Sequence, residues 1–291
     1  MVALVAEIGC NHQGDVFNAK HMIHIAAECG VDVIKGQKRH PLSLPKSQYE
    51  MPYTGPHSFG PTYGKHREAL ELPIYVHKIL AEQARGYGIE YTVSVWDITS
   101  LGEVLNELGK TIPYLKIPSA KNSDWEFLLE VKRQWAGSVH VSNGMIELAD
   151  ERRLVKMFAG RLVLYACTAA YPADHADIKL GDLVRFRREY GSDLAGIGFS
   201  GHHRGIALDA AAVALGAEWI ERHFTLDRTW KGTDHAASLE PPGLSKLRRD
   251  IHAVAQALGE RKGVLYCEQG TFLKMKGGIC ENGEYSKCDP C

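Results

Sequence analysis

The sequence predicts an α/β protein of the (β/α)₈, or TIM, barrel class with a short Cys-rich C-terminal tail. Short apolar or β-branched runs alternate with longer segments of helical period, and about eight such units fit within its 291 residues. A doubly wound open sheet is the structural alternative. The first strand, however, leads into GCNHQG at residues 9–14, which lacks the G-x-G-x-x-G spacing that often follows the first strand of that fold.

The predicted strands are short runs rich in Val, Ile, Leu and Tyr. In chain order they are Val2–Ile8, Val31–Lys35, Glu90–Ser94, Tyr114–Ile117, Ser138–Ser142, Leu162–Ala166, Leu194–Phe199 and Trp219–His223. A helical segment follows each run, which is typical of parallel strands joined by crossover helices.

The predicted helices show apolar residues at helical spacing. In the first, Ala19, Met22, Ile23 and Ala26 share one face. The helices are Asn18–Cys29, Ile74–Arg85, Leu101–Leu108, Trp125–Gln134, Ala149–Met157, Gly181–Arg188, Ile206–Leu215 and Leu244–Leu258. Residues 40–72 are too long for a simple connection, so they form either a lid over the site or a packed excursion.

Composition and charge exclude several classes of protein. A hydrophobic content of 45% argues against global disorder, and no apolar run approaches the ~18 residues of a spanning helix. Lys and Arg (34) nearly balance Asp and Glu (35), so neither nucleic acid nor a membrane is expected as a partner. No secretory signal is visible, and we expect a cytoplasmic protein that forms a homodimer.

The residues after the predicted barrel domain (1–262) form a Cys-rich extension, residues 263–291. Four of the seven cysteines lie there: Cys267, Cys280, Cys288 and Cys291. Four thiolates can bind a structural Zn²⁺, although only one tight C-x₂-C pair is present. The alternative is a tail with exposed thiols.

A ring of polar side chains follows the predicted strands, at the barrel end where active sites lie. It contains lysines, serines and histidines: Lys35, Gln37, Ser94, Lys116, Ser119, Ser142, Tyr171, Ser200, His202, Glu221, His223 and Asp234. Any single serine could be a helix cap. Two lysines are costly to bury without an anion, and converging hydroxyls suit a phosphate or carboxylate. The ring therefore predicts a phosphorylated or doubly anionic substrate.

Two histidines end neighbouring strands. His202 and His223 follow the seventh and eighth strands, so their imidazoles could share a divalent cation. Alternatively, one is a general base and the other a structural histidine.

Several motifs together resemble the sialic acid (N-acetylneuraminate) synthase family. They are AEIG and NHQG at residues 6–14, KGQ at 35–37, KIPS at 116–119, SNGM at 142–145, and the segment 197–241, which includes ERHFTLD. The resemblance covers the barrel, about residues 3–258. It does not extend to the antifreeze-like second domain of that family.

The resemblance implies condensation of phosphoenolpyruvate with a sugar-type aldehyde, which releases phosphate and gives a 2-keto-3-deoxy acid. Phosphoenolpyruvate would be held by Lys35, Ser94, Lys116, Ser119, Ser142 and Ser200. His202 and His223 would bind Mn²⁺, or else Mg²⁺ or Co²⁺. Glu221, Asp234 and Lys116 would be catalytic, and Gln37, Lys121, Tyr171 and Asp234 would face the acceptor.

Departures from the family pattern concern the acceptor. Lys121 stands where a sugar-binding carboxylate is usual, and Gly201 replaces the aspartate of S-D-H. Inverting the charge at position 121 favours an acceptor with phosphate or carboxylate over plain N-acetylmannosamine. The alternative function is a metal-dependent lyase, isomerase or hydrolase that does not use phosphoenolpyruvate; a catalytically silent binding relative is a third possibility.

Overall fold

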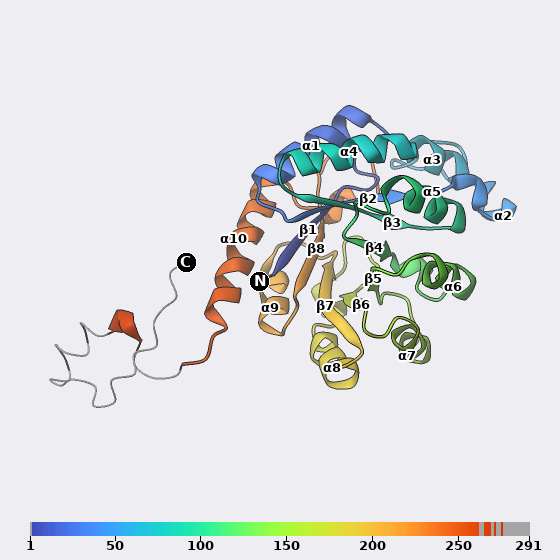
Figure 1. Ribbon diagram of the computed structural model, residues 1–291. Coiled ribbons are helices and arrows are strands. Elements are labelled where there is room, and N and C mark those ends of the chain that lie inside the picture. Colours follow the sequence, from blue (N-terminus) through green and yellow to red (C-terminus); the bar gives the residue numbers. More distant parts are fainter. Residues whose placement is uncertain (1, 262–264, 269–270, 272–274, 276–291) are drawn as a thin grey trace. The chain divides into compact units, whose positions relative to one another are not determined.

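The computed structural model describes residues 2–261, 265–268, 271 and 275. Eight parallel strands pair in chain order, and β8 pairs with β1 to close a barrel (Figure 1). The strands are β1 (Ala3–Glu7), β2 (Val33–Lys38), β3 (Glu90–Val95), β4 (Tyr114–Ile117), β5 (Ser138–Ser142), β6 (Leu162–Cys167), β7 (Leu194–Gly201) and β8 (Trp219–His223). The predicted fold class is confirmed.

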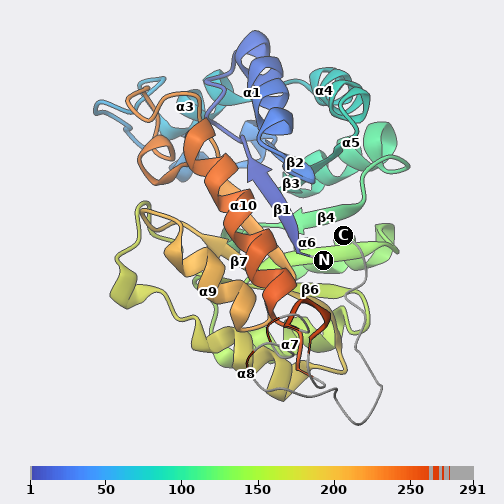
Figure 2. The ribbon, with the colours of Figure 1, turned by 90° about the vertical axis from the view of Figure 1, so that its left-hand side faces the viewer.

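Helices surround the outside of the barrel. They are α1 (Val16–Glu28), α4 (Ile74–Gly86), α5 (Ile98–Leu108), α6 (Trp125–Gln134), α7 (Leu148–Met157), α8 (Gly181–Tyr190), α9 (Ala207–Ala214) and α10 (Pro241–Ala257). Figure 2 shows α10 between α1 and α9. The connection between β2 and α4 carries α2 (Lys46–Tyr49) and α3 (Tyr63–Leu70).

Two helices begin three residues earlier than the periodicity predicts, because a capping residue or a proline, rather than apolar spacing, sets where each helix starts. Helix α5 starts at Ile98 because the Asp97 carboxylate accepts a hydrogen bond from the Ser100 backbone N–H, and the Asp97 backbone N–H in turn donates one to the Ser100 hydroxyl. Helix α10 starts at Pro241 because proline is tolerated in the first turn, where its missing N–H would have no helical partner.

Apolar side chains fill both sides of the strands. One cluster packs the outer faces of the strands against the helices, and a smaller one, Val5, Val33 and Tyr114, lies inside the barrel. The Tyr114 ring stacks on His140 with a centroid separation of 3.5 Å. This packing fills the barrel interior toward the amino ends of the strands. Polar inward-facing residues therefore gather nearer the carboxyl ends of the strands.

The chain divides into two compact units, residues 1–255 and 256–291. In the second unit Arg261 forms an ion pair with Glu268 at 2.8 Å, and Cys267 is exposed. Cys280, Cys288 and Cys291 lie outside the described residues. The zinc site and the domain boundary after residue 262 therefore stay predictions. In the described part of the chain, no helix combines the length and the hydropathy needed to cross a bilayer.

Candidate active site

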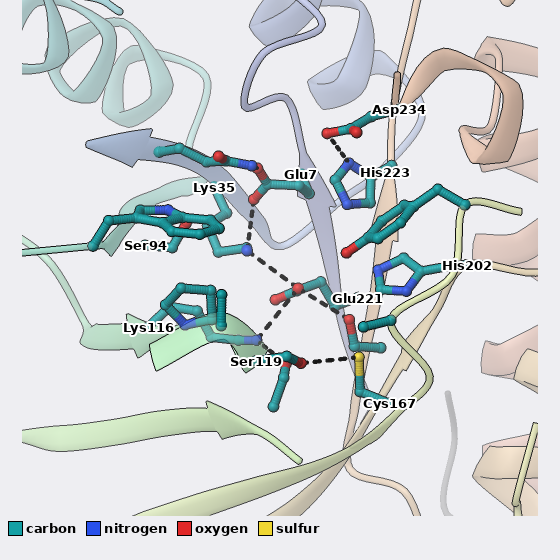
Figure 3. Close-up of a pocket in the computed structure, with 18 of the residues that line it drawn as sticks. Glu7, Lys35, Ser94, Lys116, Ser119, Cys167, His202, Glu221, His223 and Asp234 are labelled. Atoms are coloured by element: carbon teal, nitrogen blue, oxygen red, sulfur yellow. Dashed lines mark hydrogen bonds and ion pairs between the residues drawn. The ribbon is translucent and has the colours of Figure 1, made fainter. Parts of the chain in front are cut away.

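A cavity of about 340 Å³ opens at the carboxyl ends of the strands (Figure 3). Every strand except β1 and β6 contributes a side chain predicted from the sequence. Of the predicted site residues the cavity is lined by Lys35, Gln37, Ser94, Lys116, Ser119, Ser142, Tyr171, Ser200, His202, Glu221, His223 and Asp234. The structure thus brings together this predicted set, while the role of each residue stays a prediction.

Two lysines and two glutamates form a buried charge network at the base of the cavity. Lys35 Nζ lies 2.6 Å from Glu7 Oε2 and 3.1 Å from Glu221 Oε1. Lys116 Nζ lies 3.4 Å from Glu221 Oε1 and donates a hydrogen bond to the Ser142 hydroxyl at 2.5 Å. Strand register explains the meeting of these groups, because Glu7 pairs with Lys35 across β1 and β2.

The network fixes the charge of Glu221. Burial alone would raise the pKa of this carboxyl, but Lys116 and Lys35 outweigh burial and lower it to about 2. Burial lowers the pKa of Lys116, while Glu221 and Glu7 raise that of Lys35 against the effect of burial. The sequence argument that the lysines need an anionic substrate is thus incomplete, because two carboxylates of the protein already balance them.

Four serines lie around this network and do not cap helices: Ser94, Ser119, Ser142 and Ser200. Asp97, not Ser94, caps α5, and Pro118 precedes the short turn that begins at Ser119. The Ser200 hydroxyl donates to Glu221 Oε1 at 3.2 Å, and Ser119 donates to Cys167 Sγ at 3.5 Å. These hydroxyls are available to rearrange around a bound anion.

His202 and His223 lie side by side, with ring centroids 5.3 Å apart. His202 Nδ1 is 2.7 Å from the Thr168 carbonyl oxygen, which leaves Nε2 as the atom able to bind a ligand. His223 Nδ1 is buried without a hydrogen bond and lies 3.8 Å from Asp234 Oδ2. Burial lowers the pKa of His223 to about 3, so this imidazole is neutral near pH 7, as metal binding requires.

These donors fit a divalent cation that also takes water or substrate oxygens as ligands. Among the described residues, no group of three or more His, Cys, Asp or Glu side chains forms a complete metal site. An incomplete protein ligand set is typical of catalytic rather than structural metal sites. The binding of metal by His202 and His223 stays a prediction.

The predicted acceptor residues are divided between two hollows. Gln37, Tyr171 and Asp234 line the cavity, and the half-exposed Tyr171 packs on His202 with ring centroids 4.1 Å apart. Lys121 is not among the residues that line this cavity. Its Nζ donates to Asp124 at 2.8 Å, and the side chain lines an adjoining hollow of about 310 Å³.

Two arginines to which the sequence analysis assigned no site role, Arg39 and Arg67, line both hollows. The Arg39 guanidinium lies 3.2 Å from the Trp96 ring centroid, and its Nη2 donates to Gln37 Oε1 at 2.9 Å. Arg67, on α3, lies over Tyr63 at 4.9 Å from that ring. The signal for Arg39 was the alternation Lys35, Gln37, Arg39, which places every second side chain on one face of a strand.

Residues 40–72 therefore contribute to the wall of the cavity through Tyr63 and Arg67. Within the segment, the His66 ring packs 4.5 Å from Tyr53 and 5.9 Å from Phe59. The segment is a packed excursion that also reaches the site. The movement of this segment as a lid stays a prediction.

A closed parallel barrel with a cavity of lysine, carboxylate and histidine side chains at the carboxyl ends of its strands defines a class: barrel enzymes that act on small molecules. The chain belongs to the NeuB family, whose model matches residues 22–263.

The chain is similar to N-acetylneuraminate-9-phosphate synthase of Mus musculus, with 40% identity over 94% of this chain and 76% of the relative. It is also similar to N,N'-diacetyllegionaminic acid synthase of Campylobacter jejuni, with 34% identity over 88% of this chain and 77% of that one. Among solved structures, the N-acetylneuraminic acid synthetase of Leptospira borgpetersenii superposes with a TM-score of 0.79. That pair is 26% identical, and the match covers 94% of this chain and 91% of that one.

These matches confirm the resemblance seen in the sequence. The chain is a sialic acid synthase-like enzyme. It catalyses a phosphoenolpyruvate-dependent condensation whose product is a keto-deoxy sugar acid. They favour this activity over a lyase, isomerase or hydrolase on the same barrel.

Proposed function

We propose that this enzyme condenses phosphoenolpyruvate with an aldose that carries an anionic group, foremost a phosphate, and that it uses a divalent cation, foremost Mn²⁺. One observation carries the proposal. Lys35, Lys116, His202 and His223, which come from four different strands or strand ends, converge on a single cavity.

The lysines and serines suit the phosphoenolpyruvate end of the reaction. Lys35 and Lys116 supply two cations, and the hydroxyls of Ser94, Ser119, Ser142 and Ser200 supply hydrogen bonds around them. A bound phosphate competes with Glu221 for both ammonium groups. As the C–O bond to phosphate breaks, the lysines stabilise the charge on the leaving group.

His202 and His223 would hold the cation, which supplies Lewis acidity at the aldehyde oxygen. The enol carbon C3 attacks the aldehyde carbon, water adds at C2, and phosphate leaves. The added water loses two protons as its oxygen becomes the ketone oxygen: one goes to the aldehyde oxygen and one to the departing phosphate. Glu221 and Asp234, which line the cavity, would transfer them.

Two observations support an anionic acceptor. Mouse and human relatives are N-acetylneuraminate-9-phosphate synthases, whose product carries a phosphate on its ninth carbon. Because phosphoenolpyruvate adds three carbons, that phosphate belongs to carbon 6 of a six-carbon acceptor. In this chain Lys121, Arg39 and Arg67 make the hollow beside the cavity basic.

The test is release of phosphate from phosphoenolpyruvate in the presence of Mn²⁺. N-acetylmannosamine 6-phosphate, neutral N-acetylmannosamine and no aldose form three arms, each repeated with EDTA. We expect release to depend on both aldose and metal, and to be faster with the phosphorylated sugar. Faster turnover of the neutral sugar would refute the acceptor proposal. A fourth arm omits phosphoenolpyruvate, and turnover of either sugar there would favour the lyase, isomerase or hydrolase instead.

A further inference from the structure

Arg39 and Arg67 carry positive charge on which carboxylates act only from beyond ion-pair distance, Glu71 on Arg39 and Asp234 on Arg67. In the described part of the chain, neither guanidinium forms an ion pair; Arg39 donates a hydrogen bond to Gln37, and Arg67 donates one to Cys10 and interacts with the Tyr63 hydroxyl. The Nε atom of each is buried and has no hydrogen-bond partner. The two groups also repel each other, since burial and then Arg67 lower the pKa of Arg39. Unsatisfied buried donors of this kind are expensive unless a ligand completes them.

The base of the cavity is balanced differently. Lys35 and Lys116 are paired with Glu7 and Glu221, so the four side chains there carry no net charge. The unbalanced charge therefore lies at the mouth. Arg39 follows Lys35 by four residues and lies one residue past the end of β2, so their backbone positions are about 13 Å apart at the usual rise per residue. An anion at the arginines is thus separated from one at the lysines.

We propose that Arg39 and Arg67 form the subsite for the terminal phosphate of the acceptor sugar, and so select phosphorylated over neutral aldoses. This inference rests on the proposed function, because it assumes that the acceptor binds between the lysines and the mouth. A phosphate ester offers three oxygens, and two guanidinium groups can bind it through several charge-assisted hydrogen bonds. The reacting carbon and the phosphate occupy opposite ends of such an aldose, as the positions of the lysines and arginines require.

The aromatic neighbours hold both guanidiniums in place before the ligand arrives. Arg39 stacks on Trp96 and Arg67 lies over Tyr63, which restricts the rotamers of both arginines. Lys121, the residue that the sequence put forward for this task, is already paired with Asp124. The arginines are therefore the better candidates to discriminate acceptor charge.

The test compares Arg39→Met and Arg67→Met with the unaltered enzyme. We expect kcat/KM for N-acetylmannosamine 6-phosphate to fall about 10- to 100-fold in each variant, through loss of a charged hydrogen bond. KM for phosphoenolpyruvate should not change, and kcat/KM for neutral N-acetylmannosamine should fall less than that for the phosphorylated sugar, so the preference for the phosphorylated sugar should decrease. Arg153→Met is the matched control, because Arg153 also stacks on a tryptophan, Trp125 at 3.8 Å, but does not line the cavity.

A second measurement covers variants that fold poorly. Arg39→Lys and Arg67→Lys keep the charge but lose the planar fork, so calorimetric binding of N-acetylmannosamine 6-phosphate should weaken less than in the Met variants. Equal losses for phosphorylated and neutral sugars, or a raised KM for phosphoenolpyruvate, would overturn the inference and leave the proposed function intact. Failure of the unaltered enzyme to use any aldose would refute the proposed function itself.

Discussion

Replacing Glu221 by Gln should destabilise the protein strongly, because the substitution removes the carboxylate that two buried lysines share. The pKa of Glu221 is lowered from 4.5 to about 2, and each tenfold change in proton affinity corresponds to about 1.4 kcal/mol. The lysines therefore stabilise the ionised form by ~3 kcal/mol. The range of 3–5 kcal/mol is usual when one partner of a buried ion pair is removed.

The assay is thermal and urea unfolding of both proteins at several pH values. At ~2–4 °C per kcal/mol for a large domain, E221Q should melt about 6–12 °C lower at pH 7. Because the folded pKa lies below the unfolded one, the stabilisation is complete above pH 4.5 and disappears as pH falls toward 2. The difference between the two proteins should thus be constant from pH 7 to 5 and then shrink.

Glu107→Gln is the control, since Glu107 forms a half-exposed pair with Lys78 at 3.5 Å. Its effect should stay within ~0.5 kcal/mol. A melting temperature of E221Q within about 2 °C of the parent would refute the charge-network reasoning. So would a difference that grows in acid.

Three further predictions concern the metal, a helix cap and core packing. His202→Ala and His223→Ala should each abolish the rise in melting temperature produced by Mn²⁺, and unchanged Mn²⁺ binding in both would contradict the metal assignment. Asp97→Ala should lower the free energy of unfolding by ~1–2 kcal/mol by uncapping α5, whereas Asp97→Asn should retain most of it; equal losses would disprove capping. Gly198→Ala places a methyl group 2.5 Å from the Tyr165 ring and should be destabilising by ~1–3 kcal/mol. Gly196→Ala should be milder, because its closest neighbour is an oxygen of the flexible Glu218 side chain at 3.1 Å and the others are at ordinary contact distance; the reverse order would refute this packing argument.

The sequence predicts the strands well because their ends carry clear signals. The predicted bounds of Tyr114–Ile117, Ser138–Ser142 and Trp219–His223 agree with the structure to the residue. Helix starts are less accurate where caps and first-turn prolines extend the helix beyond its apolar periodicity. The predicted cavity residues follow from one rule, since every parallel strand ends on the same face of the barrel.

The residues missed are those whose importance depends on contacts between distant segments. Glu7 lies within β1, and its value as a counter-ion follows from its register with Lys35 across the closed sheet. Arg67 lies 32 positions beyond Lys35 in the chain, and the path of residues 40–72 brings it to the cavity. Periodicity describes neighbours along one helix or strand. It therefore predicts neither the ion pair of Glu7 with Lys35 nor the position of Arg67 at the cavity.

The position of Arg39 and Arg67 has a consequence for how related enzymes can diverge. Both lie on the single connection that joins β2 to α4, whereas the lysines and histidines belong to the strands and their immediate ends. Surface connections tolerate insertions and substitutions far better than the β-strands of a barrel do. Exchange of this one excursion would thus redirect the enzyme to a differently charged sugar while conserving the machinery that joins the carbons.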